Sequence, residues 1–87
     1  MSQIATGSQL RAARNALGWS LHELSQRSGV SVRTLIRYED VDDVPASRGG
    51  NMGLVVSTLE SAGIEFIGTP DDAPGIRIHR TGPDRAD

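Results

Sequence analysis

The feature that most constrains this chain is the spacing of helix-starting and helix-ending residues in its first forty positions. The segments Thr6-Gly7-Ser8-Gln9 and Ser20-Leu21-His22-Glu23 both match a capping box. In that motif a hydroxyl and the side chain three residues later satisfy backbone groups at the start of a helix. Gly18 and Gly29 follow as residues that readily adopt the positive φ found where helices end. Two residues after Gly29 comes another cap, Ser31, so we predict three short helices, the last two joined by a tight turn.

Apolar residues recur at helical spacing within these segments, and they define the expected core. A fourth helix is predicted over residues 51–62, capped by Asn51 and stopped by Gly63. Between residues 40 and 50 we expect a loop with one helical turn after Pro45. The residues expected to face inward are Leu10, Ala13, Leu17, Trp19, Leu24, Leu35, Tyr38, Met52, Val55, Val56 and Leu59.

Beyond Gly63 the apolar pattern changes to a period of two. Residues 64–67 and 76–79 are predicted strands, separated by a turn-forming stretch from Gly68 to Gly75. The expected fold is mostly α, with five helices and a C-terminal two-stranded β-hairpin. We expect a helical domain over residues 6–62, a hairpin over 63–80 that serves as a dimerisation element, and a disordered tail over 81–87.

Composition excludes several classes of function. The chain has no cysteine, so disulfides, thiolate zinc sites and cysteine nucleophiles are ruled out, and a cytoplasmic protein is expected. No apolar run approaches the roughly 20 residues that span a bilayer, so we expect no membrane partner. His22 and His79 lack metal-ligand spacing, and no nucleophile, base and orienting group occur together. We therefore expect no metal, no cofactor and no enzyme.

Charge is segregated along the chain. Residues 1–39 hold five arginines and two acids, a balance of +3, whereas residues 40–87 hold four arginines and nine acids, a balance of −5. The net charge of −2 therefore conceals a basic N-terminal half, which suits contact with phosphates.

Residues 14–39 resemble the Cro/repressor-type (XRE) helix-turn-helix family of bacterial and phage transcriptional regulators. The matching features are Leu17-Gly18-Trp19-Ser20, Glu23-Leu24, Gly29-Val30-Ser31, Thr34-Leu35 and Arg37-Tyr38-Glu39. The C-terminal half, with LESAGIEFI and PGIRI, is similar to short bacterial regulators that append a hairpin. The resemblance implies a lambda-repressor-like fold whose third helix enters the major groove of duplex DNA.

The exposed residues of that third helix are the candidates for contact with bases. Arg33 is the first, because a guanidinium can donate to both O6 and N7 of guanine, and Arg37 is the second. Val32 is a candidate for contact with a thymine methyl group. Ser31 and Thr34 are candidates for a base or a phosphate, with ordinary helix capping as the alternative.

Candidate phosphate contacts lie around the start of the second helix, because helix N-termini present free N–H groups and partial positive charge. Many relatives carry a phosphate-binding glutamine where this chain has Leu21, and the loop from Asp40 to Asp43 is acidic. We expect that loop to turn away from DNA. The candidates for phosphate contact are Ser20, His22, Arg11 and Arg48.

The resemblance also implies a buried ion pair between Arg14 and Glu39, which would orient the third helix. The hairpin supplies apolar area for a dimer, with capping of its own monomer as the alternative. The residues expected at the dimer surface are Ile64, Phe66, Ile76 and Ile78.

Two functions are compatible with these features. The first is a sequence-specific transcriptional regulator, a repressor or an activator, that acts as a homodimer on an inverted-repeat operator. The alternative is an adaptor, such as an antitoxin or anti-activator, whose acidic half binds a second protein. Leu21 and the acidic loop favour the alternative modestly.

Overall fold

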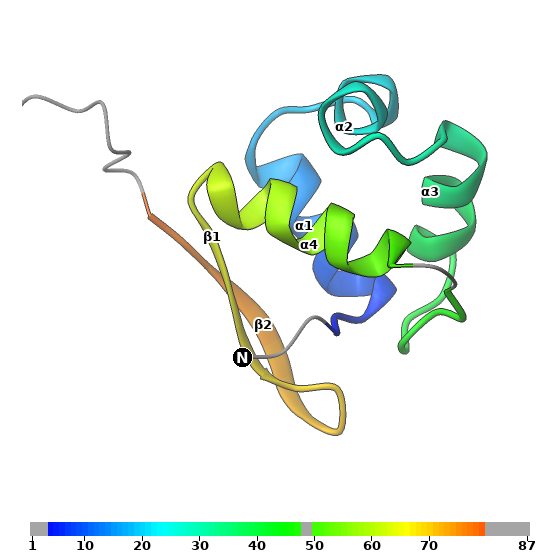
Figure 1. The fold of residues 1–87 in the computed structure, drawn as a ribbon. Helices are drawn as coiled ribbons and strands as arrows, with labels where there is room; N and C mark the ends of the chain where they lie inside the picture. The colour runs from blue at the N-terminus through cyan, green and yellow to red at the C-terminus, as the bar shows by residue number, and fades with distance from the viewer. Residues whose placement is uncertain (1–3, 48–49, 80–87) are drawn as a thin grey trace, which may run out of the picture.

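The computed structural model describes residues 4–47 and 50–79, and these form four helices and one hairpin (Figure 1). The expected positions Arg48 and 81–87 lie outside the described residues. In chain order the elements are α1 (Gly7–Ala16), α2 (Leu21–Ser28), α3 (Val32–Glu39), α4 (Asn51–Ser61), β1 (Ile64–Thr69) and β2 (Asp72–Ile78). The mostly helical fold with a C-terminal hairpin is therefore confirmed.

The expected count of five helices is wrong for the described residues, because no helical turn follows Pro45. The backbone carbonyls of this loop bond elsewhere. The carbonyl of Asp43 accepts from the N–H of Gly7 at 3.0 Å, and that of Ala46 accepts from Arg37 at 2.9 Å. The loop is thus fastened to α1 and α3, and within it the N–H of Val44 donates to the Asp43 carboxylate at 2.8 Å.

The predicted start of α1 is confirmed as a complete capping box. The Thr6 hydroxyl accepts from the N–H of Gln9 at 3.0 Å, and Gln9 Oε1 accepts from the N–H of Thr6 at 2.8 Å. Ser20 caps α2 by accepting from the N–H of Glu23 at 3.0 Å. The Glu23 carboxylate does not complete this second box, because it pairs with Arg27 one turn later at 2.6 Å.

The start of α4 differs from the prediction. Asn51 is its first helical residue and not its cap. The cap is Gly50, which has φ of +83° and makes no side-chain capping bond. A glycine in this left-handed conformation redirects the chain sharply, and it has no side chain with which to satisfy the first N–H groups.

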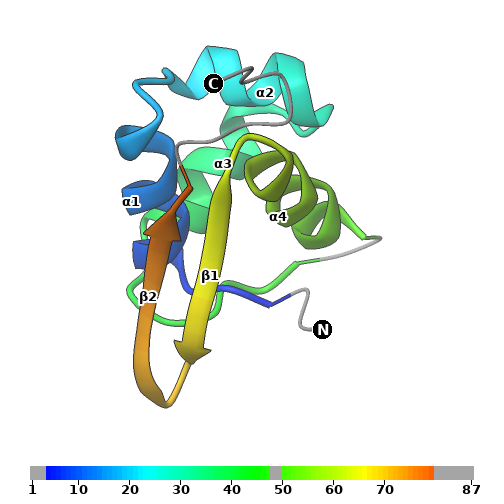
Figure 2. The same cartoon turned by 90° about the vertical axis from the view of Figure 1, so that its left-hand side faces the viewer.

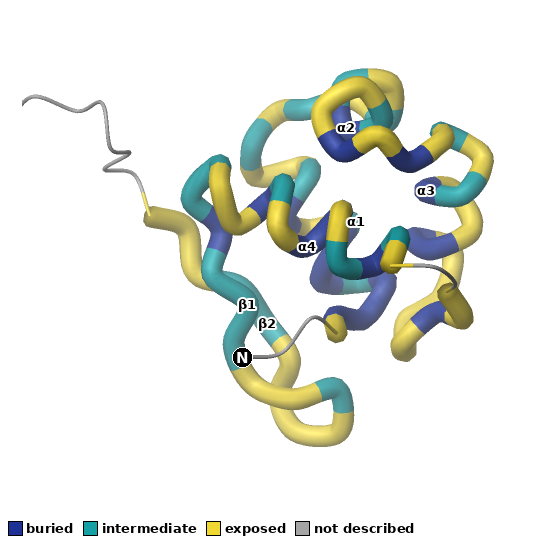
Figure 3. Tube along the Cα trace, viewed as in Figure 1, coloured by how far each residue is buried: buried dark blue, intermediate teal, exposed yellow. Residues whose placement is uncertain are grey.

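The core lies between the four helices and includes the first residue of the hairpin. Leu17 and Trp19, expected inside, are only partly buried and pack at its margin. Figure 3 shows the buried segments of the helices facing one another. The buried apolar residues are Ala5, Leu10, Ala13, Leu24, Val30, Leu35, Tyr38, Met52, Val55, Val56, Leu59 and Ile64.

The hairpin is longer than predicted. Its antiparallel strands pair Ile64 with Ile78 and Phe66 with Ile76, and the expected loop shrinks to the turn between Thr69 and Asp72. A bulge between Ile67 and Thr69 and a positive φ of 55° at Ala73 shift the register near that turn. Such an irregularity allows strands to continue through residues that a period-two pattern assigns to a loop.

The hairpin lies against α1 and α4, on the side of the molecule away from α3 (Figures 1 and 2). Gln9 anchors it, because its side-chain amide donates to the carbonyls of Gly75 at 2.8 Å and Ile67 at 3.3 Å. A single buried side chain therefore joins the start of α1 to both strands.

Candidate nucleic-acid interface

The turn between α2 and α3 sets the position of α3. Gly29 has φ of +81°, and its N–H donates to the carbonyl of Ser25 at 2.9 Å. The next residue, Val30, is buried, and its N–H donates to the hydroxyl of Ser28 at 3.1 Å. This buried valine fixes the turn, so that α3 starts at a defined point on the surface.

The outer side of α3 carries two arginines. Leu35 and Tyr38 face the core, whereas Arg33, Ile36 and Arg37 are exposed. This alternation presents the arginines to solvent, one turn apart on the same side of the helix.

The two arginines are not equivalent. Arg37 donates through Nη1 to the carbonyl of Ala46 at 2.9 Å, and its guanidinium lies 5.3 Å from the centre of the Tyr38 ring. Arg33 has no hydrogen bond or ion pair with the described part of the chain. Within residues 4–47 and 50–79, its five donors therefore have no partner.

The other α3 candidates occupy the first turn. Ser31 is exposed and Val32 and Thr34 are half-buried. The Ser31 hydroxyl accepts from the N–H of Thr34 at 3.2 Å and donates to Thr34 Oγ1 at 3.0 Å. The Ser31 hydroxyl thus caps α3, which was the alternative to DNA contact for this residue, and the Thr34 hydroxyl bonds to that capping hydroxyl.

At the start of α2, Ser20 and His22 are exposed and Leu21 is half-buried. Leu21 stands where many relatives carry a glutamine, and its side chain packs against the core. The exposed Ser20 hydroxyl and the first N–H groups of α2 remain the polar groups of this helix end.

Arg11 is engaged within the chain. Its Nη2 lies 3.5 Å from the carboxylate of Asp42, and its guanidinium also contacts the hydroxyl of Ser8 and the carbonyl of Glu39. The Ser8 hydroxyl donates to the same Asp42 carboxylate at 3.0 Å. One acid of the loop is therefore bound to the first turns of α1, and Arg11 is less accessible than the sequence suggested.

Arg14 and Glu39 form a bidentate ion pair. Arg14 Nε and Nη2 donate to the two Glu39 carboxylate oxygens at 2.8 and 2.9 Å, and Nη1 donates to the carbonyl of Trp19 at 2.9 Å. The hydrogen bond to Glu39 raises the pKa of Arg14 above its usual value. This pair joins α1 to the end of α3 and holds α3 from behind.

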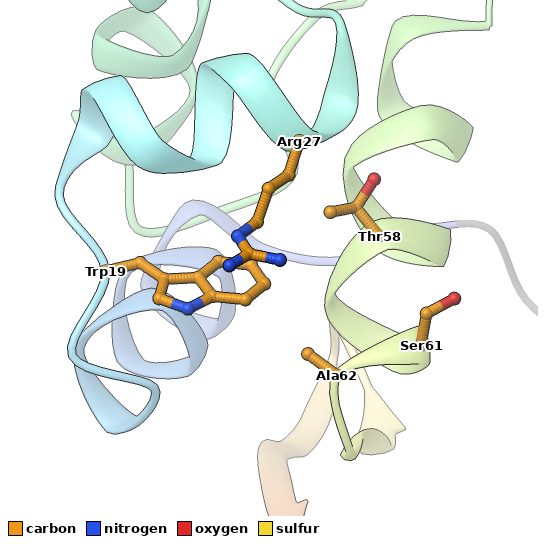
Figure 4. Close-up of a pocket in the computed structure, with 5 residues that line it drawn as sticks. All are labelled: Trp19, Arg27, Thr58, Ser61 and Ala62. Atoms are coloured by element: carbon orange, nitrogen blue, oxygen red, sulfur yellow. The ribbon is translucent and has the colours of Figure 1, made fainter. Parts of the chain in front are cut away.

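Sequence reasoning left Arg27 unassigned. Its guanidinium lies over the Trp19 ring, 4.4 Å from the ring centre (Figure 4). The Nε of Arg27 also bonds to Glu23 at 2.6 Å. The two side chains border an open cavity of about 350 Å³ between α2 and the C-terminal end of α4, also lined by Thr58, Ser61 and Ala62. In the sequence, the i,i+4 spacing of Glu23 and Arg27 indicates an ion pair on the helix, and this spacing could have pointed to the arrangement.

The four expected dimer residues differ in accessibility. Ile64 is 2% exposed and belongs to the helical core, and Phe66 and Ile76 are partly buried against it. Of these four residues only Ile78 is exposed, with 48% of its surface open to solvent. The expectation that Ile64 lies on an association surface is therefore corrected, since it packs within its own monomer.

The described residues contain no group of three potential metal ligands, and none of their helices has the length and hydropathy that a membrane span requires. In a comparison with known families, residues 10–39 match a family model described as helix-turn-helix. No curated protein matches the chain. The matched segment begins within α1 and ends with α3, and so contains the elements that position Arg33.

Proposed function

Because residues 10–39 are a helix-turn-helix of the XRE family, the DNA-binding domain of transcriptional regulators, we propose that this protein recognises a specific duplex sequence as a homodimer on an inverted-repeat operator. In this proposal α3, which begins immediately after Ser31, enters the major groove, and α2 crosses the phosphate backbone. The observation that carries the proposal is the exposed guanidinium of Arg33, which has no partner among the described residues, on a helix fixed from behind by the Arg14–Glu39 pair.

Arg33 is the principal base-reading residue. Its fork of donors, which no described residue engages, matches O6 and N7 of guanine, a contact worth about 1–3 kcal/mol of discrimination. Arg37 has to release the carbonyl of Ala46 before it can reach a base. Since one hydrogen bond contributes about 1 kcal/mol net, Arg37 is the weaker of the two. Val32 lies in the first turn of α3, where a side chain contacts a thymine methyl group.

Contacts to phosphate come from the start of α2. The exposed hydroxyl of Ser20, the first N–H groups of the helix and His22 lie together there, and helix N-termini attract anions. Arg11 can add a further contact only by exchanging Asp42 for a phosphate. Ser31 and Thr34 remain candidates for contact with DNA, because their hydroxyls can form hydrogen bonds beyond those of the cap.

A homodimer follows from the size of the recognition element. One eight-residue helix contacts only a few base pairs, so two copies are needed for a useful operator. The half-sites are expected about 34 Å apart, one turn of B-DNA, or a multiple of that distance.

Selection of bound duplexes from a random pool, followed by titration at two salt concentrations, tests the proposal. A preferred inverted repeat is expected, with affinity that falls steeply as salt rises. Arg33→Ala is expected to relax the preference at one base position of each half-site, and Arg37→Ala to relax it less. Arg77→Ala, on the hairpin remote from α3, is the matched control and should leave every base preference unchanged.

The adaptor function is distinguished by the same titration. A protein without any preferred duplex that forms a stable complex with a second protein would contradict the regulator proposal. The acidic loop supports the adaptor less than its sequence suggests, because Asp42 is bound to Ser8 and Arg11.

A further inference from the structure

The strand β2 has an open edge. The N–H of His79 donates to the carbonyl of Gly63, just before β1, at 2.7 Å. Because backbone groups point alternately to the two sides of a strand, the N–H and C=O groups of Ile76 and Ile78 point away from β1. The described sheet ends at this edge, since it contains β1 and β2 only. Unpaired edge groups are a template for another strand, and two strands alone make a weak sheet in water.

An exposed apolar side chain lies beside this edge. Ile78 is paired directly opposite the buried Ile64, and directly paired residues point to the same face of a sheet. The Ile78 side chain is therefore on the helix-facing side, yet it is 48% exposed, because it extends beyond the cover that its own helices provide.

A groove runs along the same edge, between α1 and β2. Its volume is about 340 Å³, and its lining includes Ser8 and Ala12 from α1 and Pro74 and Ile76 from β2. The small side chains of Ser8 and Ala12 leave the groove open on the helix-facing side of the sheet. This is the side on which Ile78 lies.

We propose that this edge pairs antiparallel with β2 of a second copy of the chain, so that two hairpins form one four-stranded sheet. The two-fold axis passes beside Ile76, which faces its equivalent. Each Ile76 N–H then donates to the carbonyl of the other Ile76, and each Ile78 N–H donates to the carbonyl of the opposing Pro74. This register uses the outward N–H groups of Ile76 and Ile78 and needs none from proline, which has no N–H.

The same register fills the groove. Ile78 of the second copy lies opposite Pro74 and on the helix-facing side, so its side chain enters the space beside Ala12. By symmetry, both exposed isoleucines are buried and both grooves are occupied. A strand of another protein that lacked an apolar residue at the position of Ile78, two residues from the two-fold axis, could still pair with the edge. It would leave the groove empty.

Charge also favours an antiparallel second copy. The turn end of the hairpin carries the exposed acids Asp71 and Asp72, whereas at its open end Arg77 and His79 are paired with Glu65. Antiparallel pairing places the two acidic turn ends at opposite ends of the shared sheet. Parallel pairing would bring the four acids together.

The arrangement suits the DNA-binding function, and in this respect it rests on the proposed function. The two-fold axis of antiparallel pairing is perpendicular to the sheet, and α3 lies on the far side of α1 and α4 from the hairpin (Figures 1 and 2). Both copies therefore present α3 on the same side of the shared sheet, as an inverted repeat requires. Contact through the outward face of the hairpin would direct the two α3 helices apart.

The first experiment measures the association of the full chain by sedimentation over a wide concentration range. Ile78→Asp is expected to weaken the dimer at least about tenfold, because an unpaired carboxylate would enter the groove. Leu54→Asp is the matched control, since Leu54 is an equally exposed apolar residue, at 47%, on α4. It should leave association unchanged. A chain that stays monomeric, or a dimer that Ile78→Asp does not weaken, would overturn the pairing.

The register is tested by disulfide formation, which the absence of native cysteines makes clean. Ile76→Cys is expected to cross-link to itself, because Cα atoms of a hydrogen-bonded antiparallel pair lie about 5.5 Å apart, within disulfide range. A mixture of Pro74→Cys and Ile78→Cys should form the mixed disulfide, and Leu54→Cys should form none. Cross-linking of Ile78→Cys to Ile76→Cys in place of Pro74→Cys would refute this register.

Failure of the pairing and failure of the proposed function have different signatures. A monomer that still selects one duplex sequence contradicts the pairing alone. A dimer that cross-links as expected but prefers no duplex sequence contradicts the DNA-binding proposal and leaves the interface intact.

Discussion

The guanidinium of Arg14 holds both carboxylate oxygens of Glu39, and the two side chains are only 14% and 8% exposed. The remaining Arg14 nitrogen donates to the carbonyl of Trp19. One side chain thus connects α1, the loop before α2 and the end of α3. The position of α3 relative to the rest of the molecule depends on this connection.

Arg14→Ala is expected to lower the free energy of unfolding by about 3 kcal/mol, because it leaves the buried Glu39 carboxylate without its partner. Urea unfolding followed by circular dichroism measures the change. Glu23→Gln, which breaks the exposed pair with Arg27, is the control and should cost less than about 1 kcal/mol. Equal losses in the two variants would show that the Arg14 pair has no special role.

Gly7→Ala is expected to destabilise the fold by about 3 kcal/mol through overpacking. A Cβ atom at position 7 would lie 2.0 Å from the carbonyl oxygen of Val41 and 2.3 Å from that of Tyr38, and neither backbone can move freely. Gly18→Ala provides the comparison, since position 18 has φ of +72° and open space around it. It should cost only the left-handed conformation, about 1 kcal/mol. Thermal or urea unfolding that ranks Gly18→Ala as the more damaging change would contradict this account.

Gln9→Glu separates the two roles of this residue. The carboxylate keeps an acceptor for the N–H of Thr6, but it cannot donate to the carbonyls of Ile67 and Gly75. A loss of about 2 kcal/mol is expected, with faster hydrogen exchange in the hairpin than in α2 and α3. Gln26→Glu, the same change at an exposed position of α2, should have little effect. Uniform loss of protection throughout the chain would instead indicate that Gln9 does not anchor the hairpin locally.

Glu65 provides a pH-dependent contact on the outer face of the hairpin. Its carboxylate lies 2.8 Å from His79 Nε2 and 3.3 Å from Arg77 Nη1. The hydrogen bond from His79, with a smaller effect of Arg77, lowers the pKa of Glu65 below its usual value. A lowered acid pKa stabilises the fold above the usual glutamate pKa, and the contribution is lost as pH falls through the lowered value.

Carbon-detected NMR titration of the Glu65 carboxyl measures this effect. Its midpoint is expected below that of glutamate in a short peptide, and His79→Ala should move it upward. A midpoint that does not respond to His79→Ala would show that the contact has no influence in solution.

Local signals in the sequence were sufficient for most of the helices. The caps at Thr6, Ser20 and Ser31 and the glycine at position 29 act through neighbouring backbone atoms, so their effect does not depend on distant residues. The start of α4 could not be predicted in this way. Asn51 has the side chain of a good cap, but it is the first helical residue. The cap position is taken by Gly50, which has the left-handed conformation.

The candidate site was predictable to the level of which α3 residues face outward. The difference between Arg33 and Arg37 was not, because the carbonyl of Ala46 reaches Arg37 only through the path of the loop between α3 and α4. The engagement of Arg11 by Asp42 likewise joins residues 31 positions apart in sequence. No local pattern signals such a contact.

By itself, the sequence determined that the chain forms short capped helices with a tight turn before α3, followed by two strands. These outcomes depend on dihedral preferences, caps and periodicity, which act within a few residues. Tertiary structure decided which cations remain free, which apolar residues of the hairpin are buried and where the sheet leaves an edge. Those properties depend on contacts between distant segments, and a residue type does not specify its distant partner.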